Sequence, residues 1–155
     1  MKKAFIFLAV ISALSLIAAD AKFGTREEAI AMVKKGMAYI DKVGVEKALT
    51  EMTRTNGMFI DRDLYLFALD FNGFSRANGG KPSLVGSDLA DMKDNNGYPF
   101  VKEMIALAKK SGSGWIKYLW NNKVTGKIDP KASYIERVGK TEILIGCGMY
   151  DKERK

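Results

Sequence analysis

Two aromatic side chains with polar tips, Tyr118 and Trp120, lie two residues apart in the run Trp115-Ile-Lys-Tyr-Leu-Trp120. Successive side chains of a β-strand point to opposite faces, so both rings lie on one face together with Ile116. A phenol hydroxyl and an indole N–H need hydrogen-bonding partners when they are buried. Such a face can line a pocket for a small organic molecule, and it can equally be core packing.

The sequence contains no histidine, which removes most catalytic chemistry. Ser-His-Asp and Cys-His catalysis, imidazole zinc sites and ordinary haem attachment all need that side chain. The single cysteine, Cys147, cannot form an intramolecular disulfide, and its place in an apolar run favours a buried small residue over a nucleophile. We therefore expect no enzyme and no cofactor, with an oxidoreductase that uses Cys147 as the weakest alternative.

One segment, Asp91-Met-Lys-Asp94-Asn-Asn96-Gly97, is superficially similar to a calcium loop. When Gly97 is aligned with the glycine of such a loop, Met92 falls where the first aspartate must stand. A ligand is therefore missing, and we expect a turn here and no metal site.

The first 21 residues have the layout of a secretory signal peptide. Met1-Lys-Lys precedes an apolar run from Ala4 to Ala19, and Ala19-Asp20-Ala21 fits the A-x-A cleavage pattern. The run is shorter than the roughly 20 residues that a membrane-spanning helix needs. We predict cleavage after Ala21 and one periplasmic domain over residues 22–155, with an uncleaved anchor as the alternative.

The chain is basic, with 25 Lys and Arg against 18 Asp and Glu and a net charge of +7. Basic and acidic residues are interspersed, and no run of basic residues is longer than two. This pattern indicates a solvated surface that carries both charges rather than a nucleic-acid-binding surface. We therefore expect no nucleic-acid partner, while the positive potential favours anionic ligands.

The sequence after the signal peptide predicts two helices. Thr25-Arg-Glu-Glu28 is a capping box, and Gly44 is a natural stop. An apolar stripe runs between them at helical spacing, formed by Ile30, Val33, Met37 and Ile40. A shorter helix from Val45 should follow and end before Asn56-Gly57.

The remaining elements are mostly strands. We predict strands at Met58 to Ile60, Leu64 to Asp70 and Phe74 to Ala77, then an irregular segment from Asn78 to Gly97, a helix from Phe100 to Lys110, and three antiparallel strands between Gly112 and Tyr150. Leu64 to Asp70 is apolar on both faces, so it should be central and covered on both sides. This order predicts an α+β fold with the first helix on one face of the sheet and the crossover segment on the other.

Six motifs carry a resemblance to a known family: Gly112-x-Gly114-Trp115-Ile-Lys-Tyr118-Leu-Trp120, Pro130-Lys131-x-Ser133-Tyr134, Ile145-Gly-Cys-Gly148-Met-Tyr150, Asn56-Gly57-Met-Phe59, Tyr65-Leu-Phe67-Ala-Leu-Asp70-x-x-Gly73 and Leu84-Val-Gly86. Together they resemble single Cache domains of type 2, the PAS-like extracytoplasmic sensors of bacterial receptors and kinases. The resemblance covers roughly residues 25–151. It implies a PAS-like antiparallel sheet of five or six strands, with a small ligand, usually a short carboxylate, held under the crossover segment. Family members are typically flanked by membrane-spanning helices, and here the sequence stops at Lys155, so a stand-alone periplasmic form is expected.

The resemblance also implies a set of ligand-binding residues: Tyr118, Trp120, Lys131 and Tyr134. One ammonium, two phenol hydroxyls and an indole N–H are suitable donors for a buried carboxylate. Lys131 and Tyr134 fall on opposite faces of a regular strand, so both can reach one ligand only if Lys131 precedes the strand or a bulge intervenes. Tyr65, on the central strand, and Arg76, on the next, are further candidates.

The expected function is a non-catalytic sensor of a small anionic metabolite, acting in signal transduction or chemotaxis. Its signal would pass to a separate membrane receptor, sensor kinase or transporter. The alternative is a structural or protein-interaction subunit whose PAS-like core is filled by its own side chains. The sequence leaves open the ligand, the partner, and whether two copies pair through their N-terminal helices.

Overall fold

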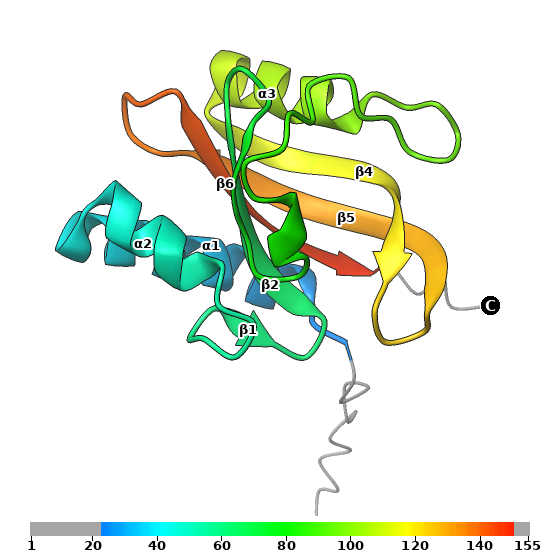
Figure 1. Cartoon of the computed structure of the whole chain (residues 1–155), viewed down its shortest axis with the longest axis horizontal. Coiled ribbons are helices and arrows are strands. Elements are labelled where there is room, and N and C mark those ends of the chain that lie inside the picture. Colours follow the sequence, from blue (N-terminus) through cyan, green and yellow to red (C-terminus); the bar gives the residue numbers. More distant parts are fainter. Residues whose placement is uncertain (1–22, 151–155) are drawn as a thin grey trace, which may run out of the picture.

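The computed structural model describes residues 23–150 (Figure 1). The predicted signal peptide and its cleavage site lie outside these residues. The elements in chain order are α1 (Arg26–Val43), α2 (Val45–Met52), β1 (Ile60–Asp61), β2 (Leu64–Asp70), β3 (Ser75–Asn78), the 3-10 helix η1 (Pro82–Leu84), α3 (Phe100–Ser111), β4 (Ser113–Asn122), β5 (Lys127–Arg137) and β6 (Ile143–Tyr150). Between residues 23 and 150, no helix combines the length and the apolar character that crossing a membrane would require.

The strands form one antiparallel sheet in the order β1-β2-β6-β5-β4, and β3 also pairs with β2. Helices α1 and α2 cover one face of this sheet, while α3 and the segment that leads to it cover the other (Figure 1). The last strand, β6, lies in the middle of the sheet between β2 and β5. The structure confirms the predicted α+β, PAS-like architecture.

The first helix begins and ends where its sequence signals predict. The Thr25 hydroxyl accepts the Glu28 backbone N–H at 3.2 Å, and the Glu28 carboxylate accepts the Thr25 N–H at 2.8 Å. At the other end, Gly44 has a φ of 85°, which glycine adopts far more readily than other residues. This helix packs on the sheet through its buried residues Ala29, Val33, Gly36 and Ile40.

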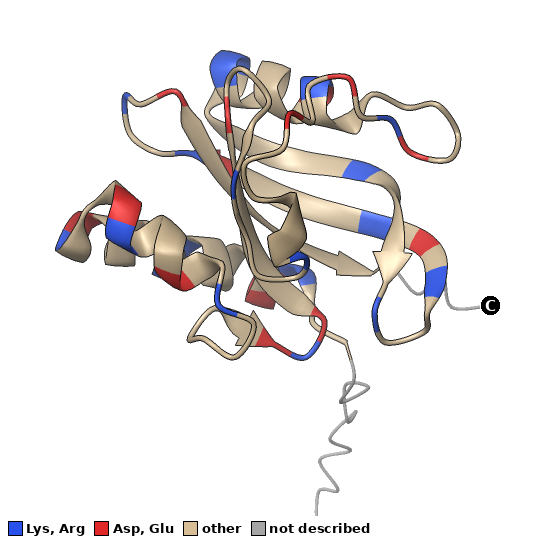
Figure 2. Cartoon of the chain, viewed as in Figure 1, with Lys and Arg blue, Asp and Glu red and all other residues tan. Residues whose placement is uncertain are grey.

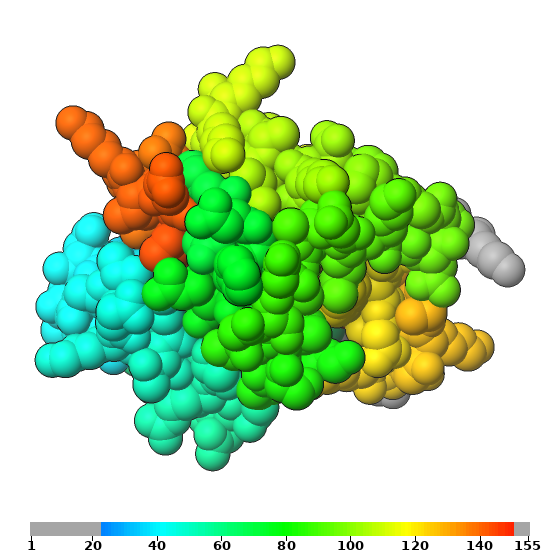
Figure 3. Space-filling model, turned by 45° about the horizontal axis from the view of Figure 1, so that its top comes forward, coloured from blue at the N-terminus to red at the C-terminus, as the bar shows by residue number. Residues whose placement is uncertain are grey.

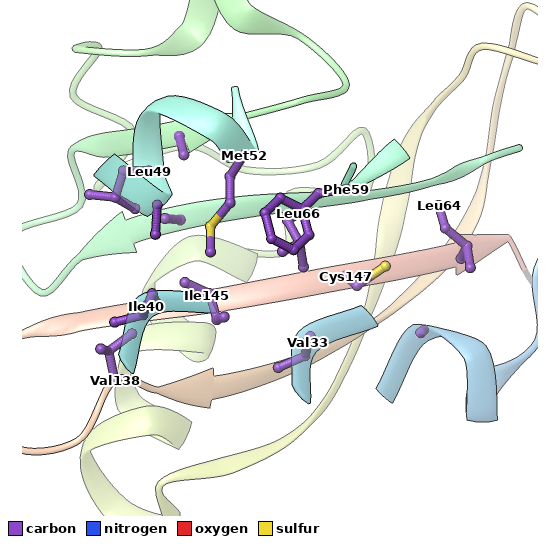
Figure 4. Packing of buried hydrophobic residues seen from close by; sticks show 14 of the residues in the cluster. Val33, Ile40, Leu49, Met52, Phe59, Leu64, Leu66, Val138, Ile145 and Cys147 are labelled. Carbon is purple, nitrogen blue, oxygen red and sulfur yellow. The ribbon is translucent and has the colours of Figure 1, made fainter. Parts of the chain in front are cut away.

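Two hydrophobic clusters flank the sheet, and β2 contributes to both. Leu64, Leu66 and Ala68 point to the cluster under α1 and α2, part of which is shown in Figure 4. Phe67 and Leu69 point to the cluster under α3. The prediction of a central strand covered on both faces is therefore confirmed.

Cys147 belongs to the cluster under α1 and is fully buried among apolar side chains (Figure 4). Burial raises the pKa of its thiol to about 12, so the thiol is protonated at neutral pH. A protonated, inaccessible thiol is a poor nucleophile. Its environment is that of a structural cysteine.

The first and third strands differ slightly from the prediction. The expected strand at Met58 to Ile60 is a two-residue strand, β1, and Met58 lies before it with 45% of its surface exposed. β3 begins one residue late because Phe74 forms an isolated bridge with Asp88 of the following loop. Both differences lie at the edge of the sheet, where few neighbours fix a strand's limits.

Asp63, in the turn between β1 and β2, connects the two ends of the described chain. Its Oδ1 accepts the Gly24 backbone N–H at 2.6 Å, just before α1. Its Oδ2 accepts the N–H of Tyr150, the last residue of β6, at 3.4 Å. The carboxylate is buried, and burial raises its pKa although these two N–H donors act against that shift.

We expect Asp63→Ala to lower the free energy of unfolding by about 2–4 kcal/mol, because two buried amides lose their acceptor. Urea unfolding followed by circular dichroism measures this. Asp41→Ala is the control, since Asp41 is exposed on α1 and should change stability little. Equal urea midpoints for the two variants would show that the Asp63 contacts do not stabilise the fold.

Candidate ligand-binding site

The face of the sheet under α3 carries a row of polar side chains. Register pairs Tyr118 of β4 with Lys131 of β5, and Lys131 with Tyr150 of β6. Ser133 lies two residues along β5 and is fully buried. These residues share a face because the pairing between β4, β5 and β6 is regular over this stretch.

Lys131 is the central residue of this row and is 1% exposed. Its side chain crosses β6 above Gly148, where a Cβ atom would overlap the Lys131 Cε and the Ser133 Oγ. Its Nζ donates a hydrogen bond to the Tyr65 hydroxyl on β2 at 2.7 Å. The same Nζ lies 4.0 Å from the centroid of the Tyr65 ring and 5.0 Å from that of Tyr150. A lysine on β5 is thus held between two tyrosine rings from other strands.

Lys131 forms none of the ion pairs within residues 23–150. Its charge acts on the buried carboxylate of Asp63 only from a longer distance, where it opposes the rise in the pKa of Asp63 that burial causes. Burial, the largest influence, acts against the charged form of Lys131, whereas electrostatic interaction with Tyr65, Tyr118 and Tyr150 and the hydrogen bond to Tyr65 act for it; the net direction of the pKa of Lys131 is upwards. A raised pKa favours the ammonium form at neutral pH. It has three N–H donors, and the Tyr65 hydroxyl accepts one of them.

Tyr118 and Trp120 form an aromatic wall with Phe100 of α3. Tyr118 stacks on Phe100 with ring centroids 4.5 Å apart and planes 3° from parallel. Trp120 meets both rings edge-on, at 5.6 Å from Phe100 and 6.1 Å from Tyr118. The Tyr118 hydroxyl shares a hydrogen bond of 2.9 Å with the Ser133 hydroxyl, and burial raises its pKa, which keeps the phenol neutral.

An inner cavity of about 30 Å³ lies against this wall. That volume is enough for about two water molecules. Its walls are mainly apolar, with polar atoms at Tyr65, Tyr118, Ser75 and Asn78. The apolar part is lined by Phe67, Leu69, Leu84, Leu89, Met92, Phe100, Val101, Met104 and Trp120.

An outer cavity of about 280 Å³ adjoins the inner one, since Tyr65, Met92 and Trp120 line both. It lies between the loop before α3 and the hairpin that joins β4 to β5. These two segments, in green and yellow, meet at the surface in the space-filling view (Figure 3). The outer cavity therefore lies between the surface loops and the residues that line the inner one.

The structure brings together Tyr65, Tyr118, Trp120 and Lys131 from the predicted set. It does not bring Tyr134 to them: β5 has no bulge between Lys131 and Tyr134, so Tyr134 lies on the α1 face. There its ring lies 5.6 Å from Trp115, and its hydroxyl donates to Glu136 at 3.4 Å.

Arg76 lies apart from the cavities as well. Its guanidinium contacts Glu46 of α2 at 3.1 Å and Asp70 at 3.9 Å. It lines neither the inner nor the outer cavity. Arg76 and Tyr134 are therefore left out of the site proposed below.

Sequence reasoning did not name three residues that shape the site. The sequence places Phe100 only at the start of a helix, and Ser133 and Gly148 only in family motifs. The pairing of β5 with β6 places Ser133 opposite Gly148, which could not be known before the strand order. The repeat of glycine at positions 146 and 148 was the available signal for a close approach from a neighbouring strand.

Comparison with known sequences gives two relatives that are signalling proteins. The chain is 30% identical over 89 residues to the sensor histidine kinase MctS of Rhizobium johnstonii, covering 57% of this chain and 19% of that protein. It is 29% identical over 90 residues to the methyl-accepting chemotaxis protein McpP of Pseudomonas putida, covering 58% and 16%. The matched part spans less than a fifth of either relative.

Comparison with solved structures gives sensor domains of the same fold. A methyl-accepting chemotaxis protein of Vibrio parahaemolyticus superposes with a TM-score of 0.69 at 27% identity, covering 80% of this chain and 86% of that one. A Cache chemosensory domain, described for its recognition of carboxylic acids, superposes with a TM-score of 0.69 at 22% identity, covering 81% and 92%. The family model for single Cache domain 2 matches residues 9–154. Since that match takes in nearly the whole sequence, the chain belongs to the single Cache domain 2 family.

Proposed function

We propose that this protein is an extracytoplasmic sensor that binds a short carboxylate beside Lys131 and reports it to a separate membrane partner. The observation that carries the proposal is the buried side chain of Lys131, which forms no ion pair within residues 23–150. Lys131 lines neither cavity itself, but its Nζ donates to the hydroxyl of Tyr65, which lines the inner cavity with Tyr118. A buried charge is costly unless it is paired and hydrogen-bonded. An anionic ligand supplies that pairing.

The donors around the cavity suit a carboxylate. The Tyr65 hydroxyl accepts from Lys131, so its own proton is free to be donated to a ligand oxygen. The Tyr118 hydroxyl can donate in the same way when Ser133 donates to it. Hydrogen bonds from an ammonium to a carboxylate are about twice as strong as neutral ones. The site therefore favours an ionised acid over its neutral amide.

The size of the inner cavity limits the ligand and its affinity. As found, the cavity has room for about two waters, so an acid of four to six heavy atoms fits only with small movements of flexible walls such as Met92 and Met104. At no more than about 1.5 kcal/mol per heavy atom, such an acid gains at most about 6–9 kcal/mol. We expect dissociation constants in the micromolar range or weaker.

The relatives support a signalling role. MctS is a sensor kinase and McpP a chemoreceptor, so the matched segment belongs in both cases to a longer signalling protein. One structural neighbour recognises carboxylic acids, which agrees with the ligand class proposed here. We propose that the partner is a membrane receptor, sensor kinase or transporter, and that residues 1–21 direct the chain to the periplasm.

Titration of the purified protein with acetate, propionate and amino acids tests the proposal, with acetamide as the neutral control. We expect the acids, but not acetamide, to raise the melting temperature. Tyr118→Phe should weaken acid binding by about fivefold to tenfold, the value of one lost neutral hydrogen bond. If no acid shifts the melting temperature, the protein does not have the proposed site.

The small volume of the inner cavity favours one alternative, a structural or interaction subunit with a self-filled core. The two functions predict different behaviour of Lys131 and Tyr65 when an acid is added. A self-filled core leaves the Lys131 ammonium bonded to Tyr65 at every acid concentration, whereas a ligand site changes the environment of both side chains on titration.

A further inference from the structure

Three lysines surround the outer cavity, each from a different part of the chain. Lys81 follows β3, Lys93 precedes α3, and Lys123 lies in the turn between β4 and β5. All three are exposed. Between residues 23 and 150, no acidic side chain forms an ion pair with any of them. This contrasts with the mixed distribution of basic and acidic residues over α1 and α2 (Figure 2).

One acid, Asp94, also lines the outer cavity. Its carboxylate already accepts hydrogen bonds from three backbone amides. Its Oδ1 accepts from Asn96 and Tyr98 at 2.9 and 3.0 Å, and its Oδ2 accepts from Leu119 at 2.9 Å. The hydrogen bond from the Leu119 N–H is the main cause that lowers the pKa of Asp94. Asp94 is therefore an anion whose oxygens are bonded to the backbone. Three lysines against one such carboxylate leave the outer cavity net positive.

The two cavities are neighbours that share the lining residues Tyr65, Met92 and Trp120, and the outer one is cationic. Tyr65 lines the inner cavity, and its hydroxyl accepts the hydrogen bond from Lys131 behind it. Met92 and Trp120 line both cavities, so the boundary between the two is apolar on these sides. A ligand that is too long for the inner cavity can reach the lysines by extending past these two side chains.

We propose that the outer cavity is a second anionic subsite, so that the protein binds acids with a second negative group better than monoacids of the same length. This inference rests on the proposed function, because the first carboxylate of such a ligand occupies the inner site beside Lys131. The short methylene spacer of a diacid then lies against Met92 and Trp120, the apolar side chains shared by both cavities. The lysines then contact the second carboxylate.

Succinate and butyrate test this directly, since both have four carbons and differ in one terminal carboxylate. Their affinities are measured by calorimetry at pH 7 in 50 mM and in 500 mM salt, with acetate alongside. We expect succinate to bind about tenfold more tightly than butyrate in low salt, because exposed ion pairs contribute modestly and additively. The difference should shrink in high salt, where such pairs are screened.

A triple variant, Lys81→Gln, Lys93→Gln and Lys123→Gln, should bring succinate and butyrate to equal affinity and leave acetate unchanged. The control triple variant changes Lys47, Lys110 and Lys140 to Gln, which removes the same charge from exposed positions outside both cavities. It should keep the preference for succinate. Circular dichroism verifies that both variants fold.

Two results would overturn the inference while leaving the proposed function intact. One is acetate binding that depends on Lys131 without any preference of the wild type for succinate over butyrate. The other is a preference for succinate that survives in the cavity variant. If none of the three acids binds the wild type, the proposed function and this inference both fail.

Discussion

Lys131→Met should lower the affinity for short carboxylates by at least about a hundredfold while leaving the folded protein as stable as the wild type or more stable. Binding is lost because an anion would enter a buried site without its counter-charge, a loss that typically costs several kcal/mol. Stability is kept because a flexible apolar side chain of similar length replaces a buried charge that has no carboxylate partner among residues 23–150.

Calorimetry with acetate and urea unfolding measure the two halves of this prediction. Lys110→Met is the matched control, since Lys110 is exposed on α3 and lines neither cavity. It should bind acetate as the wild type does. A Lys131→Met protein that binds acetate normally, or one that unfolds much more easily, would show that Lys131 serves the fold rather than the ligand.

Gly148→Ala should lower the free energy of unfolding by about 2–3 kcal/mol and abolish acid binding. The backbone at Gly148 accepts any residue, because its φ is not in the left-handed region, but the added methyl would overlap the Lys131 stem and the Ser133 hydroxyl. Overpacking of this kind costs about 1–3 kcal/mol. It would also push Lys131 away from Tyr65, so the ligand would lose its ammonium.

A double-mutant cycle separates this crowding from a general effect of the substitution. In a Lys131→Ala background the overlap with the Lys131 stem is gone and the overlap with the Ser133 hydroxyl remains, so Gly148→Ala should cost less than in the wild type. Urea unfolding of the four proteins gives the coupling energy. An equal cost of Gly148→Ala in both backgrounds would show that Lys131 does not cross β6 at this glycine.

Local features of the fold were predictable because their signals are short in sequence. The capping box at Thr25, the stop at Gly44 and the two-sided apolar run at Leu64 to Asp70 each specify one element, and the structure has all three. Alternation in β4 also placed Tyr118 and Trp120 on one face correctly. The same rule gave the warning about Lys131 and Tyr134, and the regular register of β5 shows that they lie on opposite faces.

The rest of the site depends on contacts between distant segments. Lys131 meets Tyr65 only because β6 lies between β5 and β2 and presents Gly148 at the crossing point. Arg76 was a reasonable partner for an acid on sequence grounds, but Glu46 of α2 is beside it. The outer cavity joins loops after β3, before α3 and after β4, so no local pattern marks its lysines as neighbours.

A crystal structure of the purified protein soaked with acetate, beside one without it, tests the central claim most directly. The account predicts a carboxylate in the inner cavity with one oxygen about 2.7–2.9 Å from the Lys131 Nζ. It also predicts that the Tyr65 or Tyr118 hydroxyl donates to the same group. An unchanged Lys131 to Tyr65 bond with no acetate density beside it, at concentrations well above millimolar, would contradict the account.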